Sequence, residues 1–256
     1  MGDIMSNTSF SFILTILAGL STMIGALFIF IKSINKDKII TSSLAFASGV
    51  MISVSITDLI PESLKLLITV LSSKVTILIS FLSILLGIVL SMIINYYLPD
   101  TPKDNIKNNS LYKVGIISML AIILHNIPEG VITFLAGTSN TKLGLILAST
   151  IAIHNIPEGI SISIPIYYST NSYKKALLYS GISALSEPFG AFLAFIFLKD
   201  IINNPILGIM LSLVAGIMIE ISITNLIPTA YEYHDKKYFY IFFLIGFFFM
   251  LLKFII

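Results

Sequence analysis

Residues 113–168 read KVGIISMLAIILHNIPEGVITFLAGTSNTKLGLILASTIAIHNIPEGISISIPIYY. Two apolar stretches, 113–136 and 141–168, are joined by a short linker, and each is long enough to cross a bilayer as a helix, which needs roughly 20 apolar residues. The hexapeptide HNIPEG occurs in both, as His125–Gly130 and His154–Gly159. The pattern predicts a helical hairpin inside a membrane, with the same polar motif at mid-depth in each arm.

The composition of the whole chain also indicates a membrane protein. Of 256 residues, 56% are hydrophobic and 11% are charged, whereas an average soluble domain has roughly 25% charged residues. All 15 basic residues are lysines and the net charge is only +2, which excludes a nucleic-acid-binding protein. The chain has no cysteine, which excludes disulfides, thiolate metal sites and thiol nucleophiles.

Breaks rich in lysine, asparagine and proline divide the chain into eight apolar stretches, which we expect to be the transmembrane helices of an all-α, polytopic protein. They are residues 10–31, 39–64, 75–98, 113–136, 141–168, 175–198, 205–230 and 238–256. The longest linker, Pro99–Tyr112, is too short for a soluble domain, so we expect a single membrane domain over residues 1–256. The first stretch is longer than the apolar core of a signal peptide and is expected to stay in the membrane.

The lysines predict the orientation, because cytoplasmic loops are enriched in positive charge. Ten lysines fall at the odd-numbered connections, against five at the even-numbered connections and the C-terminus. We therefore expect both termini outside. A composition rich in isoleucine, lysine and asparagine, with no arginine, favours an AT-rich bacterial genome and hence a bacterial cytoplasmic (inner) membrane.

A second repeat lies outside the hairpin. Residues Gly49–Pro61 (GVMISVSITDLIP) recur as Gly216–Pro228 (GIMIEISITNLIP), on the second and seventh expected helices, which run in opposite directions. The two HNIPEG helices are antiparallel as well, so both repeats are inverted. Inverted repeats around proline-broken helices are typical of secondary transporters. The expected arrangement is three helices, a central pair and three helices (3+2+3).

The HNIPEG motif combines side chains that bind metals. Its His and Glu are four residues apart and therefore lie on one helical face. Its proline removes a backbone N–H, so we expect a kink and a freed carbonyl beside each His. Two adjacent copies offer imidazoles, carboxylates and amides that suit Zn(II), Fe(II), Mn(II) or Co(II), as one ion or two. The candidate ligands are His125, Asn126, Glu129, His154, Asn155 and Glu158.

Insertion energies favour a functional site. A carboxylate at the bilayer centre costs about 2.5–3.5 kcal/mol. Glu129, Glu158 and Glu187 lie deep in apolar stretches whose lysines are confined to the ends, so no intramembrane lysine is expected to pair with them, and a bound cation is the simplest compensation. Glu187 precedes Pro188 in SALSEPFGA, where we expect a third broken helix. It is either a metal or pathway residue or a protonated structural acid.

Of three further residues, two have two interpretations each, and the third is expected at the surface. Met51 is either a thioether ligand or a packing residue, and Met218 matches it in the second copy of the longer repeat. Asp58 either lines an entrance or lies at a solvated helix end, and Asn225 replaces it in the second copy. His234 lies in a hydrophilic run after the seventh stretch and is expected at the surface.

The two HNIPEG motifs, followed by SEPFGA and VAGIM, resemble the ZIP family of divalent-metal transporters, and most closely its bacterial ZupT-like branch. The resemblance covers nearly the whole chain, from FILTILAGLSTMIGA near the N-terminus to VAGIMIEISITNLIP. It implies the same eight-helix, 3+2+3 layout with both termini outside.

The resemblance further implies a binuclear site. His125, Glu129, His154 and Glu158 would form the first metal position, with Met51 where some relatives supply a ligand. Asn126, Asn155 and Glu187 would form the second, with the two HNIPEG glutamates bridging. The sequence departs from the family pattern in two places. The linker Pro99–Tyr112 lacks the histidines common in the family. Thr224 and Asn225 stand where relatives usually have acidic residues, while Glu220 is an added acid.

The function that follows is uptake of divalent metal ions into the cytoplasm by alternating access, without enzymatic activity or a resident cofactor. The resemblance implies zinc, iron, manganese, cobalt and cadmium as substrates, and a homodimer by analogy. The expected partners are divalent metal ions and the lipid bilayer. The alternatives are an exporter, a non-transporting metal sensor and a zinc-dependent intramembrane hydrolase, whose usual signature of two His four apart is absent.

Overall fold

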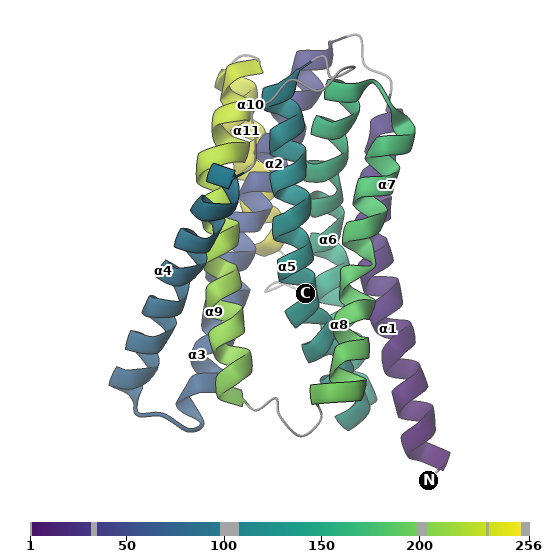
Figure 1. Cartoon of the computed structure of the whole chain (residues 1–256), viewed down its shortest axis with the longest axis vertical. Helices are drawn as coiled ribbons and strands as arrows, with labels where there is room; N and C mark the ends of the chain where they lie inside the picture. The colour runs from purple at the N-terminus through teal and green to yellow at the C-terminus, as the bar shows by residue number, and fades with distance from the viewer. Residues whose placement is uncertain (1, 32–34, 98–107, 199–203, 234–235, 252–256) are drawn as a thin grey trace.

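The computed structural model describes residues 2–31, 35–97, 108–198, 204–233 and 236–251, and all regular elements in these ranges are helices. The all-α prediction is confirmed for this part of the chain (Figure 1). In chain order the elements are α1 (Gly2–Ala26), the 3-10 helix η1 (Leu27–Phe30), α2 (Lys36–Val54), the π-helical segment η2 (Ser55–Leu59), α3 (Ile60–Ile68), α4 (Ser73–Tyr97), α5 (Asn109–Ser139), α6 (Thr141–Thr170), α7 (Tyr173–Ala184), α8 (Ser186–Leu193), the π-helical segment η3 (Ala194–Leu198), α9 (Asn204–Ile221), the π-helical segment η4 (Ser222–Leu226), α10 (Ile227–Tyr233) and α11 (Lys236–Leu251).

Asparagines mark the ends of the two central helices. Asn108 and Asn140 are the N-caps of α5 and α6, and each side-chain oxygen accepts a hydrogen bond from the backbone N–H three residues on, at 3.0 and 3.1 Å. Asn140 also ends α5, so a single residue separates the two helices. Asn171 ends α6 in the left-handed conformation, with a φ of 53°. The tight helical hairpin predicted from the sequence is therefore present.

Six helical spans are long and apolar enough to cross a membrane. They are Asn7–Phe30, Lys36–Ile68, Ser73–Tyr97, Asn109–Ser139, Thr141–Thr170 and Asn204–Tyr233. The expected stretch 175–198 is divided at Leu185 between α7 and α8, immediately before the Ser-Glu-Pro sequence. The described part of the stretch 238–256 belongs to α11, which has 16 residues. The count of eight spans therefore stays a prediction.

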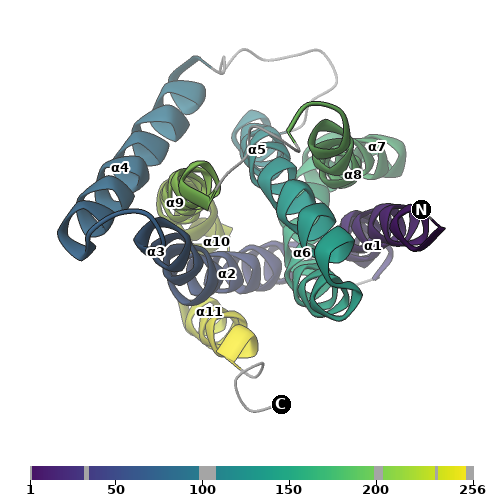
Figure 2. The ribbon, with the colours of Figure 1, turned by 90° about the horizontal axis from the view of Figure 1, so that it is seen from below.

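The helices pack into two groups. The α5–α6 group contains α1, α5, α6, α7 and α8, and the α2–α9 group contains α2, α3, α4, α9, α10 and α11. The two groups lie side by side when the bundle is seen along its axis (Figure 2). They meet where α2 contacts α6 and where α5 contacts α9. A cavity between the groups therefore has walls from both.

The surface of the bundle is apolar and its interior contains buried hydroxyls. α4 lies at the edge of the bundle in Figure 2, and its Ile77, Phe81 and Leu86 are exposed. Inside, the Ser212 hydroxyl lies 2.6 Å from that of Ser63 and 2.7 Å from that of Ser80, which joins α9 to α3 and α4. Apolar side chains outside, and serine hydroxyls inside that hydrogen-bond to one another between helices, suit a bilayer, where lipid cannot hydrogen-bond.

Both copies of the longer repeat contain a π-helical segment at the same place. η2 covers SITDL, η4 covers SITNL, and a proline follows each of them, Pro61 in α3 and Pro228 in α10. π-helical segments are rare and occur often at functional sites. The two repeated sequences therefore have matching local structure.

Most of the lysines that the structure describes lie at one end of the bundle. Seven of the ten lysines on described segments are at the start of α2, α5, α7 and α11, which lies at the top of Figure 1: Lys36, Lys38, Lys113, Lys174, Lys175, Lys236 and Lys237. Lys65, Lys74 and Lys142 lie toward the opposite end. We call the first the lysine-rich end.

Candidate metal site

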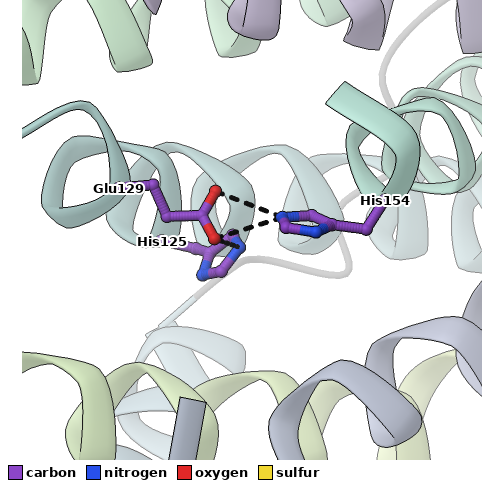
Figure 3. Close-up of side chains that lie close together, drawn as sticks. All are labelled: His125, Glu129 and His154. Atoms are coloured by element: carbon purple, nitrogen blue, oxygen red, sulfur yellow. Dashed lines mark hydrogen bonds and ion pairs between the residues drawn. The ribbon is translucent and has the colours of Figure 1, made fainter. Parts of the chain in front are cut away.

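A cluster of two histidines and a glutamate lies buried between α5 and α6 (Figure 3). Glu129 is at its centre: its Oε1 atom lies 3.1 Å from His125 Nε2, on its own helix, and 3.1 Å from His154 Nε2, on α6. The ligand atoms of the three residues lie within 4.8 Å of one another, and each residue is at most 5% exposed. Imidazole nitrogens and a carboxylate at such spacing can hold a divalent metal ion.

Glu158 extends this cluster from α6. Its Oε1 atom lies 3.4 Å from His125 Nε2, and its side chain is 1% exposed. Both carboxylate oxygens lack a hydrogen-bond partner among the described residues. A buried carboxylate in this condition is costly unless a cation or a proton compensates it.

Asn155 and Glu187 form a neighbouring pair. The Asn155 Nδ2 group donates to Glu187 Oε2 at 2.9 Å and to the backbone oxygen of Ala18 at 3.0 Å, so it links α6 to α8 and α1. Asn126 on α5 donates from Nδ2 to the backbone oxygen of Ser183 at 3.4 Å. The hydrogen bonds of both amides are made by their nitrogens. The two amide oxygens and Glu187 Oε1 accept no hydrogen bond from the described residues. These oxygens are the kind of neutral and anionic ligands that a second ion would need.

The glycine that ends each HNIPEG motif permits the close helix packing at this site. A Cβ atom on Gly130 would lie 1.9 Å from the backbone oxygen of Glu187, so only glycine allows α5 to approach α8 there. A Cβ atom on Gly159 would lie 1.9 Å from the backbone oxygen of Thr22 in α1. The prolines lie inside α5 and α6, which continue through them as helices. The motif thus supplies candidate ligands and the packing surface that brings Glu187 near them.

A cavity of about 230 Å³ reaches the cluster from the end opposite the lysine-rich end. Glu129 and His154 lie at its inner part, and its other walls include Asp58, Glu62 and Lys65. The last two form an ion pair at 3.0 Å, with side chains 49% and 72% exposed, which places the mouth of the cavity at the surface. The cavity has walls from both helix groups, so a relative movement of the groups would open or close it.

The remaining sequence candidates have different surroundings. Asp58 is half-buried in the wall of this cavity. Met51 is fully buried and belongs to the apolar core, which also contains Met218. His234 lies outside the described residues.

Sequence reasoning missed the partners that come from distant elements. The backbone oxygens of Ala18 and Ser183 anchor the two asparagines, and a main-chain oxygen has no signature in a sequence. Glu220 is also buried, and its carboxylate accepts hydrogen bonds from Ser91 of α4 and, at 2.8 Å, from Thr224. A carboxylate inside an apolar stretch indicates that Glu220 needs a polar partner, but only the packing of α4 against α9 shows that the partner is Ser91.

Comparison with known proteins identifies relatives over most of the chain. The ZIP zinc transporter family profile matches residues 100–253. The zinc transporter ZupT of Clostridium perfringens is 38% identical, over 91% of this chain and 91% of its own length. The zinc transporter ZupT of Streptococcus mutans is 40% identical, over 87% of this chain and 88% of its own length.

Proposed function

Because the chain belongs to the ZIP zinc transporter family, we propose that it carries divalent metal cations across a membrane through the buried His/Glu cluster of α5 and α6. The observation that carries the proposal is the contact of Glu129 with both histidines in a cluster that a surface cavity reaches. A cation can therefore enter from one end of the bundle and exchange its water for protein ligands.

The site we propose contains His125, Glu129, His154 and Glu158 around one ion, and Asn126, Asn155 and Glu187 beside a second. This assignment is supported by the oxygens that have no hydrogen bond to any described residue: those of the two amides, both oxygens of Glu158, and Glu187 Oε1. Zinc is the first substrate to test, since the relatives are named zinc transporters. Iron, manganese, cobalt and cadmium follow, because a site without thiolates is not strongly selective for soft metals.

Two cavities related by the longer repeat support alternating access. Five residues of the cavity that reaches the cluster are Thr57, Asp58, Pro61, Glu62 and Lys65. The shift of 167 residues that relates the two copies, continued past Pro61, matches these positions to five residues that line a second cavity of about 380 Å³ near the lysine-rich end. They are Thr224, Asn225 and Pro228 within the repeat, and Thr229 and Glu232 just after it. The first cavity includes His154 and Glu129, whereas the lining of the second, as far as the structure describes it, includes no residue of the cluster.

This pair of cavities favours a simple transport cycle. In the described conformation the cluster is accessible from the end opposite the lysines, and movement of the α5–α6 group against the α2–α9 group would connect it instead to the second cavity. Because cytoplasmic ends are rich in lysine, the direction from first to second cavity is uptake. The cycle fits eight spans in the 3+2+3 arrangement with both termini outside, in one domain of the inner membrane of a bacterium. A homodimer is part of the same proposal by family analogy.

Metal uptake into proteoliposomes tests the proposal. We expect the unaltered protein to take up Zn(II), and His125→Ala, Glu129→Ala and Glu158→Ala each to abolish the flux. Asp37→Ala is the matched control, because it removes an exposed carboxylate in the first turn of α2 and should leave the flux intact.

The uptake experiment, together with a hydrolysis assay and metal accumulation in cells, separates the rival functions. Tightly bound, non-exchanging zinc without flux would indicate a metal sensor. Bound zinc without flux but with hydrolysis of an intramembrane substrate would indicate an enzyme. Zinc flux in proteoliposomes combined with reduced metal accumulation in cells that express the protein would indicate an exporter.

A further inference from the structure

A third cavity, separate from the two described above, lies on the side of the bundle between the two helix groups. Its volume is about 360 Å³, and none of the candidate metal ligands lines it. Ile160 on α6 belongs to the α5–α6 group, and Phe28 lies on η1, which contacts α6 and α1, whereas Phe46 and Phe242 belong to the α2–α9 group. Two hydroxyls, those of Ser42 and Ser43, are the polar side chains of its lining. The cavity is therefore an apolar site at a joint between the groups.

This cavity opens toward the surroundings of the bundle. Ile31 and Ile245, which also line it, are 55% and 49% exposed. At the depth of a membrane-spanning helix those surroundings are lipid, and an apolar cavity open to lipid suits an acyl chain. A water-soluble ligand would find only two hydroxyls to bond there.

The rim of the cavity at the lysine-rich end is cationic. Lys38 precedes Ser42 by one helical turn on α2, and its Nζ atom lies 4.2 Å from the centre of the Tyr238 ring on α11. Lys36 lies half a turn further out, with its Nζ atom 5.5 Å from the ring centre of Tyr168 on α6. Asp37, between them in sequence, is exposed. The rings come from the two helices that also supply Phe242 and Ile160, so the lysines lie beyond the cavity toward the lysine-rich end, along helices that form its walls.

From the apolar lining and the cationic rim together, we propose that this cavity binds an anionic phospholipid, with an acyl chain between η1, α2, α6 and α11 and the headgroup phosphate at Lys36 and Lys38. Juxtamembrane lysines attract anionic lipids. The bound lipid would contact both helix groups at once. It is a specific site, in contrast to the general lipid contact of a helix such as α4.

The absence of tryptophan from the chain gives a direct test. Phe242→Trp places the sole tryptophan, which can be excited selectively over the tyrosines, in the cavity wall, and Phe81→Trp places it on the exposed face of α4, where it contacts bulk lipid. Each variant is reconstituted in phosphatidylcholine vesicles that contain graded fractions of brominated phosphatidylglycerol or brominated phosphatidylcholine. Bromine quenches the fluorophore when the lipid is adjacent, so the quenching curve gives relative affinity.

In F242W we expect the cavity to prefer phosphatidylglycerol over phosphatidylcholine, by about fivefold for each lysine that contacts the headgroup. In F81W we expect equal quenching by the two lipids. Adding Lys36→Gln and Lys38→Gln to F242W should remove the preference. Equal affinity for both lipids at F242W would overturn the proposal. So would a lack of quenching by either lipid, which would mean that a polypeptide, such as a second copy of the chain, covers the cavity. Phe46→Trp, on α2, reports the same cavity if F242W does not fold.

Discussion

Replacing Gly130 by alanine tests how closely α5 must approach α8 for the site to form. The added Cβ atom would lie 1.9 Å from the Glu187 backbone oxygen and 2.8 Å from its carbonyl carbon. Real Cβ contacts are essentially never shorter than 3.0 Å, so α8 must move by at least 1.1 Å. The obstructing atoms are backbone, and no side-chain rotation can relieve the contact.

The magnitude of the effect follows from what this movement does to Glu187. Its carboxylate accepts a hydrogen bond of 2.9 Å from Asn155 on α6, and a shift of 1.1 Å is enough to break that bond. Losing a group that orients metal ligands typically weakens metal binding about 10- to 100-fold. Overpacking itself costs about 1–3 kcal/mol of stability. We therefore expect Gly130→Ala to fold with a lowered melting temperature and to lose most zinc uptake.

Gly181→Ala is the matched control for this experiment. Gly181 lies on α7 in the same helix group, and its added Cβ atom would lie 3.6 Å from the Met23 sulfur, which is ordinary contact. The assay is Zn(II) uptake by proteoliposomes at matched protein orientation, with equilibrium zinc binding and thermal unfolding in detergent measured on the same preparations. Wild-type uptake and binding by Gly130→Ala would refute the reasoning, because α5 and α8 could not then pack as closely as the structure has them.

Three further predictions follow from the cavities and the interior. Asp58→Asn installs the amide that the second copy of the repeat has at Asn225. Because it removes a negative charge that steers cations into the cavity, it should raise the KM for zinc uptake severalfold at low ionic strength and much less at high salt. An effect on KM that does not depend on salt would contradict this role. Glu220→Gln should slow zinc flux while zinc affinity at the cluster stays unchanged, because Glu220 hydrogen-bonds to Thr224 in the wall of the second cavity; a large loss of equilibrium zinc binding would count against that role. Ser212→Ala should lower stability by about 1–3 kcal/mol in thermal unfolding with little change in flux, since it leaves two buried hydroxyls with one partner fewer; an unchanged melting temperature would count against the serine contacts.

The central hairpin could be predicted from the sequence because its determinants are local. Helical periodicity places His125 and Glu129 on one face, and the single residue between α5 and α6 forces the second motif to lie beside the first. The juxtaposition of the two motifs thus follows from chain geometry before any packing is known. That the cluster binds metal stays a prediction, which the uptake experiment addresses.

The break before Glu187 could also be expected, because Pro188 cannot donate a backbone hydrogen bond and is tolerated in the first turn of a helix. The count of spans was harder to predict than their positions. Six spans coincide with apolar stretches, but α7 and α8 are separate short helices, and hydropathy alone does not distinguish a continuous helix from a broken one.

By itself, therefore, the sequence determined the helical class, the membrane setting, the hairpin and the kinds of side chain at its centre, because each depends on composition or on spacing within a few helical turns. Only the tertiary structure decided that Glu129 contacts both histidines, that Asn155 joins Glu187 to α1, and that one of two repeat-related cavities reaches the cluster. These features depend on contacts between helices far apart in the chain. Nothing in the sequence near one partner specifies the other, so only the packing of the whole bundle brings them together.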